Sequence, residues 1–173
     1  MSGNIINEER EKEMIDAEIV RAKTLHERFG DEMLNNHSLF GLMETYRKAI
    51  VNSHELMEEM NILNGCTECA ENARAGSCCF QGIEEWYDHI LLLINLMFGV
   101  AITTSHDILG GCLFVGEKGC TLLARHAFCV NYICPALKDS LTNFQREKLQ
   151  FINGHELYSG WELEKSIRHW VRV

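Results

Sequence analysis

Apolar residues recur at steps of three and four along the first third of the chain, with Glu, Arg and Lys between them. This period places them on one face of a helix, so we expect an amphipathic helix over residues 8–29 that stops at Gly30 and Asp31. Its apolar face is Ile15, Ile19, Ala22, Leu25 and Phe29. A second helix is expected over residues 38–63, ended by Asn64 and Gly65. Its inner face is Met43, Tyr46, Ile50, Met57 and Met60.

The pattern changes at residue 66. Residues 66–81 are rich in Cys, Gly, Ala and Ser and have no period, which predicts a loop or a broken helical turn. A third helix is expected over residues 82–98, where Glu84 and Glu85 in the first turn complement the helix dipole. Its second half is apolar nearly all round, so this helix should be central in the fold.

The last third alternates short apolar runs with turns. Two runs around a Gly-Glu-Lys-Gly turn predict a small hairpin over residues 112–122, and residues 125–134 are expected to form a second cysteine-bearing loop. Pro135 suits the first turn of a helix over residues 136–152. Asn153 and Gly154 should end that helix before a last helix over residues 156–170.

Together these elements predict a mainly α-helical fold. We expect a compact helical bundle of about five helices, with a small cysteine-rich subdomain that contains the minor β-hairpin. The 173 residues suffice for a single domain with a substantial core. Within it, residues 1–64 would form an N-terminal helical pair, residues 65–136 the cysteine-rich region with the central helix, and residues 137–173 the C-terminal helices.

Charge narrows the classes of function. The chain has 16 Lys and Arg against 25 Asp and Glu, a net charge of −9, which disfavours nucleic acid because phosphate binding needs clustered basic residues. The same charge disfavours an anionic membrane surface, and the most apolar stretch, residues 90–102, is too short to span a bilayer. The first twelve residues lack a signal-peptide pattern, so we expect a cytoplasmic, reducing compartment, where clustered cysteines bind metal or serve catalysis.

Eight cysteines carry the candidate chemistry, and the 65 residues before the first and the 39 after the last contain none. They are Cys66, Cys69, Cys78, Cys79, Cys112, Cys120, Cys129 and Cys134. Thiolates are soft anionic donors that bind zinc and iron–sulfur clusters. The segregation therefore predicts a metal site in which about four of the eight thiolates hold an iron–sulfur cluster, of the [4Fe–4S] type, or zinc.

Spacing ranks these candidate ligands. Cys66 and Cys69 form a CxxC step, from which two sulfurs can reach one metal. The side chains of the adjacent Cys78 and Cys79 are expected to diverge, so that both would not bind one tetrahedral ion. His126 lies among the later cysteines and is a possible extra ligand, although a loop histidine bonded to backbone is the plainer interpretation. One site and two four-cysteine sites both remain open.

The order of the cysteines resembles that of the YkgJ-like family of cysteine-rich proteins, which are described as zinc- or iron-chelating. Over residues 66–136 the shared features are a CxxC, a Cys-Cys pair, a cysteine before a short apolar strand, a Gly-Cys pair, a cysteine after an Arg-containing loop and a final cysteine. Here they are Cys66 and Cys69, Cys78 and Cys79, Cys112, Gly119-Cys120, Cys129 and Cys134. The resemblance implies zinc or iron–sulfur ligation, linked in some members to redox or radical chemistry. This chain has His126, Val130 and Ile133 where the family often has Pro, Arg and Pro.

Three classes of function stay open at this point. The first is a metal-binding protein that holds an iron–sulfur cluster or zinc and serves electron transfer, redox sensing or metal handling, with a redox or other protein partner unspecified. The second is an enzyme that uses an open cluster iron or a reactive thiolate, which three ligating cysteines and an open position would favour over four ligands. The third is a helical interaction protein without metal, for which replacing Cys66 and Cys69 with Ser leaves folding and binding intact.

Overall fold

A computed structural model describes residues 2–71 and 78–171 of the chain, without the side chains of residues 2–12, 67–71 and 136. The described residues form seven α-helices, one 3-10 helix and one two-stranded sheet. The prediction of a mainly helical chain with a small hairpin is therefore confirmed. There are seven helices rather than about five because the second expected helix is divided and a short helix forms in the second cysteine-bearing loop.

Helix α1 (Ser2–Asn35) continues past Gly30 and Asp31, so the predicted stop there is wrong. Met33 explains the continuation, because it is fully buried and extends the apolar face of the helix by one turn. Burying such a side chain contributes about 1.5–3 kcal/mol, which outweighs the roughly 1 kcal/mol by which Gly disfavours a helix. The ring of His26 lies over Gly30, where a Cβ would be 3.3 Å from its Cδ2 atom.

Helix α2 (His37–Glu59) is capped by Asn36, whose side chain accepts a backbone N–H of the first turn. Most of its predicted inner face is buried, namely Met43, Tyr46, Ile50 and Met57. The chain then turns at Asn61, which has a left-handed φ of 57°, and α3 (Ile62–Glu71) follows with Ile62 buried. The predicted end at Asn64 and Gly65 is therefore wrong, and Cys66 lies on a helix rather than in a loop.

The third expected helix is divided into a 3-10 helix, η1 (Ile83–Trp86), and α4 (His89–Met97). The division falls at Asp88, which is extended and whose carboxylate accepts the backbone N–H groups of Ile90 and Leu91, each at 3.0 Å. Glu84 consequently does not face the dipole of a long helix. It is buried, and its carboxylate accepts the N–H of Gly82 at 2.9 Å.

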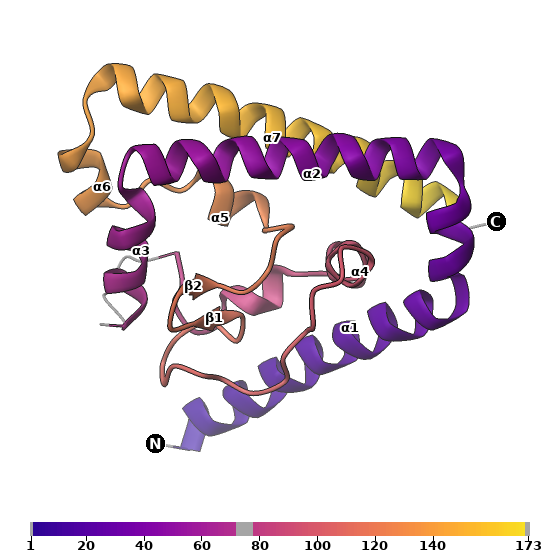
Figure 1. Cartoon of the computed structure of the whole chain (residues 1–173). Helices are drawn as coiled ribbons and strands as arrows, with labels where there is room; N and C mark the ends of the chain where they lie inside the picture. Colours follow the sequence, from indigo (N-terminus) through magenta and orange to yellow (C-terminus); the bar gives the residue numbers. More distant parts are fainter. Residues whose placement is uncertain (1, 72–77, 172–173) are drawn as a thin grey trace.

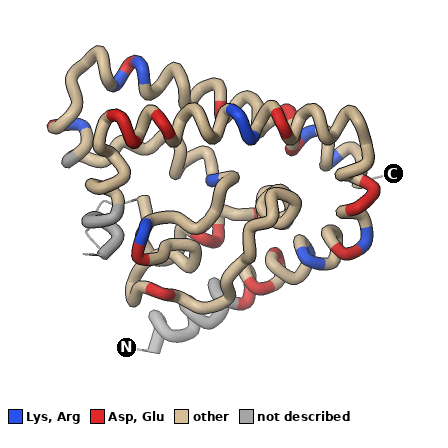
Figure 2. Tube along the Cα trace, in the orientation of Figure 1, with Lys and Arg blue, Asp and Glu red and all other residues tan. Residues whose placement is uncertain are grey.

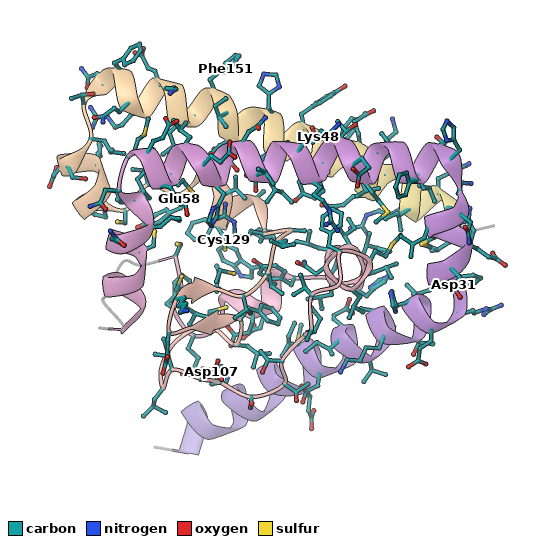
Figure 3. The ribbon with its side chains drawn as sticks, viewed as in Figure 1. Asp31, Lys48, Glu58, Asp107, Cys129 and Phe151 are labelled. Carbon is teal, nitrogen blue, oxygen red and sulfur yellow. The ribbon has the colours of Figure 1, made fainter. Side chains whose placement is uncertain are left out.

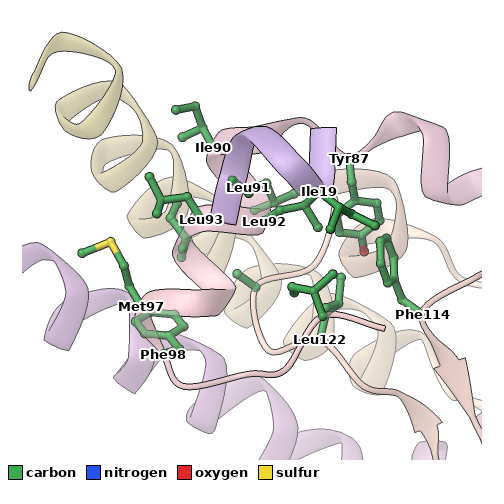
Figure 4. Packing of buried hydrophobic residues seen from close by; sticks show 14 of the residues in the cluster. Ile19, Tyr87, Ile90, Leu91, Leu92, Leu93, Met97, Phe98, Phe114 and Leu122 are labelled. Atoms are coloured by element: carbon green, nitrogen blue, oxygen red, sulfur yellow. The ribbon is translucent and has the colours of Figure 1, made fainter. Parts of the chain in front are cut away.

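Helix α4 forms the centre of the main hydrophobic cluster, as expected from its apolar circumference, and residues 90–95 are all buried. Figure 4 shows its side chains gathered with Ile19 of α1 and with Phe114, which precedes the hairpin. The polar member of this run is Asn95. Its amide group makes four hydrogen bonds of 2.8–3.0 Å, to the carbonyls of Leu91 and Ala124 and from the N–H groups of Leu123 and Ala124.

The predicted hairpin is present and consists of β1 (Val115–Gly116) and β2 (Gly119–Cys120). The two strands are antiparallel, with Val115 opposite Cys120 and Gly116 opposite Gly119. Gly119 has a φ of 95°, a conformation that favours glycine and allows the tight return of the chain.

Helix α5 (Ala127–Asn131) lies in the region expected to be a loop, and α6 (Pro135–Ser140) begins with Pro135 as predicted. Thr142 then caps α7 (Asn143–Trp170). This helix passes through Asn153 and Gly154, so the predicted break there is wrong. Asn153 is instead buried on the inner face of α7 and donates to the carbonyl of Val130 at 2.7 Å.

Figure 1 shows α2 and α7 side by side in opposite directions, with α1 diverging from them and α4 and the hairpin filling the space between. The most extensive helix contacts join α2 with α7 and α1 with α4. Acidic and basic residues both occur along the three long helices (Figure 2). None of the helices that the structure describes combines the length and apolar character needed to cross a membrane.

Candidate metal centre

Seven of the eight cysteines line one cavity of about 200 Å³. Three of them come from α3 and from the segment before η1. The other four come from the segment before β1, from strand β2, from α5 and from the residue before α6. The seven are Cys66, Cys78, Cys79, Cys112, Cys120, Cys129 and Cys134. Cys129, labelled in Figure 3, comes from α5. The side chain of the predicted ligand Cys69 lies outside the described residues. The fold thus brings both groups of cysteines, separated in sequence by the central helix, to the same place.

Backbone hydrogen bonds hold the two groups together. The N–H of Cys112 donates to the carbonyl of Cys79 at 2.9 Å, and the N–H of Gln81 donates to the carbonyl of Gly110 at 3.2 Å. Phe80 and Gly111 form an isolated antiparallel bridge between these two contacts. The thiols on either side are therefore positioned by main-chain pairing and not only by side-chain packing.

The side chains of Cys78 and Cys79 converge, which corrects the expectation that they diverge. Their Sγ atoms are 3.9 Å apart. Two thiolates on one tetrahedral zinc, each about 2.3 Å from the ion, are about 3.8 Å apart. The Sγ–Sγ distance of this adjacent pair is therefore close to that of two thiolates on one zinc ion.

These two thiols also determine each other's ionisation. A hydrogen bond from the Cys79 thiol lowers the pKa of Cys78, against the effect of burial and with help from the positive charge of Arg125. The same hydrogen bond and burial raise the pKa of Cys79. The pair consequently loses its first proton readily and retains its second.

The other buried thiols are held by neighbouring groups. Cys112 is 5% exposed and its Sγ accepts the N–H of Phe114 at 3.4 Å, while burial raises its pKa. The Tyr87 hydroxyl donates to Sγ of Cys129 at 3.9 Å, and burial raises the pKa of Cys129 to about 12. Both thiols are therefore held in the protonated form near neutral pH, and only a nearby positive charge would favour their ionisation. Cys120 lines the same cavity but is exposed to solvent.

A buried ion pair lies behind the thiols. Arg125 lines the cavity, and its guanidinium is 3.7 Å from Oε1 of Glu156, a fully buried carboxylate on α7. The Ser53 hydroxyl of α2 bonds to the other oxygen of Glu156. The charge of Arg125 acts on Cys78 and Cys129 and lowers the pKa of each relative to burial alone. Sequence reasoning missed this group, because Ser53, Arg125 and Glu156 are far apart along the chain. Only the packing of α2 and of the segment before α5 against α7 brings them together.

His126 and Cys134 have capping positions. Nδ1 of His126 accepts the N–H of Phe128 at 3.2 Å, which makes this histidine the N-cap of α5. Burial lowers the pKa of His126 and favours the neutral ring. The backbone N–H of His126 donates to the Tyr87 hydroxyl at 3.0 Å. Cys134 precedes Pro135 at the N-cap of α6. The role of His126 as an extra ligand stays a prediction.

Among the side chains that the structure describes, no three or more Cys, His, Asp or Glu residues are grouped closely enough to hold an ion as they stand. The cavity therefore gathers thiols, and the prediction that about four of them ligate a metal stays a prediction. The question of one site or two also stays open.

These features define a mainly helical protein with a cysteine-lined cavity. No family model matches the chain, and no curated protein or solved structure matches it. The resemblance to the YkgJ-like family accordingly stays a prediction.

Proposed function

We propose that the cavity is a thiolate metal centre and that the protein holds zinc or an iron–sulfur cluster for electron transfer, redox sensing or metal handling. The observation that carries the proposal is the convergence of seven thiols, from two groups far apart in the sequence, on one cavity. Free structural cysteines have no physical reason to gather in this way, whereas a soft cation needs several thiolates within reach.

The surroundings suit bound anionic sulfur. Four thiolates on one zinc ion leave two negative charges in excess, and burying such charge is unfavourable without a compensating group. Arg125 supplies a positive charge beside these thiols. Bound metal would supply a Lewis-acidic or redox-active ion, and the protein residues would set its solvent access and local charge.

The spacing of Cys78 and Cys79 bears on the type of metal. Two sulfurs 3.9 Å apart suit one tetrahedral ion. In a [4Fe–4S] cluster each iron takes one cysteine, so an adjacent pair at this spacing is not required. This geometry supports a single-ion site at the pair, while the remaining thiols suffice in number for a cluster.

The proposal is tested by metal and acid-labile sulfide analysis, with a visible spectrum, on protein purified without oxygen. Bound zinc without colour, or iron with sulfide and a broad visible absorption, supports it. Cys112→Ser and Cys129→Ser should lower the bound metal, while Leu109→Ser, at an exposed apolar residue, should not. A well-folded protein that contains no metal, and takes up neither zinc nor iron with sulfide on reconstitution, would show that the proposal is wrong.

A second candidate function is an enzyme with a reactive thiolate, and the Cys78–Cys79 contact favours it. Its discriminating test is alkylation of folded, metal-stripped protein by iodoacetamide, in which a thiolate displaces iodide. Selective reaction at Cys78 at neutral pH, lost in Cys78→Ser and unaffected by added zinc, would favour this function over metal binding. Protection of Cys78 by zinc would favour the metal centre.

A further inference from the structure

The contact between Cys78 and Cys79 bears on oxidation as well as on metal ligation. Both residues are reduced and partly exposed, and their Sγ atoms are 3.9 Å apart. A disulfide bond is about 2.05 Å long, so the two sulfurs need to approach each other by about 1.9 Å. Rotation about the Cα–Cβ bonds supplies this movement, because different staggered rotamers move Sγ around an unchanged backbone. The pair can therefore close without displacing a helix or strand.

The backbone at this pair is held by a neighbouring segment. The carbonyl of Cys79 accepts the N–H of Cys112 at 2.9 Å, and Phe80 forms an antiparallel bridge with Gly111. Consecutive Cα atoms are about 3.8 Å apart, whereas most disulfides join Cα atoms that are about 4.4–6.8 Å apart. A disulfide between neighbours on a fixed backbone is therefore strained, and strained disulfides are readily reduced. This favours a reversible bond over a permanent one.

A small oxidant has access to the pair. Both thiols line the cavity of about 200 Å³, and one water molecule occupies about 30 Å³ in the liquid. Hydrogen peroxide is a neutral molecule with two oxygen atoms, so it fits this space. Because it carries no charge, it also passes the apolar side chains that line the cavity, such as Ile83 and Val115, at little cost in desolvation.

We propose that Cys78 and Cys79 form a reversible redox site, in which a peroxide oxidises the two thiols to a disulfide and a small thiol reduces it again. The proposal goes beyond the metal centre and does not depend on it, because only the two thiols and the small molecules take part. It assigns the cavity an oxidant by chemical class, namely a small neutral peroxide.

The oxidation has two steps. One sulfur of the pair, as the thiolate, attacks an oxygen of hydrogen peroxide. The O–O bond breaks, a sulfenic acid forms, and the hydroxide that leaves takes up the proton released by this thiol. The second sulfur then attacks the sulfenic sulfur, so that the S–S bond forms as the S–O bond breaks, and the departing hydroxide takes the proton of the second thiol. The two thiols lose two electrons, and the peroxide is reduced to two molecules of water.

Peptide mapping of oxidised protein tests the proposal. The reduced, metal-stripped full chain receives an equimolar amount of hydrogen peroxide, and the remaining thiols are blocked with N-ethylmaleimide in urea. A protease that cleaves after Glu leaves Cys78 and Cys79 together in the peptide 72–84 and every other cysteine in a different peptide. The expected product is this peptide without maleimide and lighter by two hydrogen atoms. Dithiothreitol added before blocking should restore alkylation of both cysteines.

Two controls separate the effect of the fold from adjacency in the sequence. Cys120→Ser removes an exposed thiol of the same cavity and should give the oxidised peptide in the same yield as the wild type. Oxidation in concentrated urea should give several times less of it, because the unfolded chain does not hold the two sulfurs in contact.

Any of four results overturns the proposal. The peptide 72–84 carries two maleimide groups after the peroxide treatment, or it is linked to another peptide, such as that of Cys112, whose N–H is bonded to Cys79. Alternatively, Cys120→Ser abolishes the oxidised peptide, which shows that a different pair is involved. Lastly, an equal yield in urea shows that the fold does not prepare the pair for oxidation.

Discussion

Replacing Arg125 with Met should show how much the ion pair between Arg125 and Glu156 contributes to the free energy of unfolding. The substitution keeps much of the side-chain volume and removes the charge, which leaves the carboxylate of Glu156 buried with Ser53 as its hydrogen-bond donor. The perturbation therefore acts on electrostatics far more than on packing.

The magnitude follows from the distance of 3.7 Å between Nη2 of Arg125 and Oε1 of Glu156. At an effective dielectric constant of about 20, the attraction between two unit charges at this distance is about 4–5 kcal/mol. Removing one partner of a buried pair destabilises proteins by about 3–5 kcal/mol, because the other charge is left uncompensated. We expect Arg125→Met to lower the free energy of unfolding by about 3 kcal/mol, or the melting temperature by about 10 °C.

The assay is a double-mutant cycle on metal-stripped protein by urea unfolding, with Arg125→Met, Glu156→Gln and the double variant. The double variant should be more stable than the sum of the single losses predicts, by at least 1 kcal/mol, because removing both charges leaves neither uncompensated. Strictly additive losses would refute the reasoning and show that the contact at 3.7 Å carries no coupling.

The pH dependence provides an independent check on the same pair. Burial raises the pKa of Glu156 in the folded protein, against the lowering effect of Arg125. A carboxyl whose pKa is higher in the folded state contributes stability below its unfolded pKa of about 4.5 and loses it as pH rises. Without Arg125 the pKa of Glu156 should rise further, so the loss of stability in Arg125→Met relative to the wild type should grow as pH rises above about 4.5. Glu156→Gln should abolish this pH dependence.

Three further predictions concern the stability of the fold and are measured by urea or acid unfolding. Gly154→Ala should stabilise the protein by up to about 1 kcal/mol, because its Cβ meets open space, whereas Gly160→Ala should destabilise it, because its Cβ would lie 2.9 Å from an aromatic ring of α2. Equal effects of the two would contradict this assignment. Asn95→Leu should remove about 3 kcal/mol or more, since several buried backbone groups lose their partner, and a loss under 1 kcal/mol would contradict it. Burial would raise the pKa of Glu18, but hydrogen bonds from His89 outweigh it and lower that pKa. Stability from this carboxylate is therefore present above about pH 4.5 and lost as pH falls further, a loss that Glu18→Gln should reduce.

The sequence predicted the parts of the fold that depend on local pattern. The apolar circumference of residues 90–95 identified the central helix, and the turn residues around Gly119 identified the hairpin. The predicted helix ends were wrong where the burial of apolar or polar side chains in the tertiary structure outweighs the low helix propensity of glycine. Gly30 and Gly154 look like helix ends, but buried residues on the same helices, Met33 and Asn153, continue each helix through them.

The candidate site, like the fold, could be predicted from the sequence only in part. The segregation of cysteines along the chain indicated one functional region, and the described thiols do line one cavity. Neither the approach of Cys78 to Cys79 nor the pairing of Arg125 with Glu156 could be predicted. The first depends on side-chain torsions, and the second on how the segment between β2 and α5 packs against α7.

Three of the four hydrogen bonds of Asn95 join the central helix to the segment between the hairpin and α5. They fix residues 123 and 124 to the central helix, and so they position the chain on both sides, with strand β2 before it and Arg125 after it. Small zinc domains fold only when the metal arrives, because they have no other core. Here a hydrophobic core and a buried amide hold these segments together largely by contacts that involve no thiol. If the cavity holds a metal as proposed, we expect the metal to be removed and restored without unfolding of the protein.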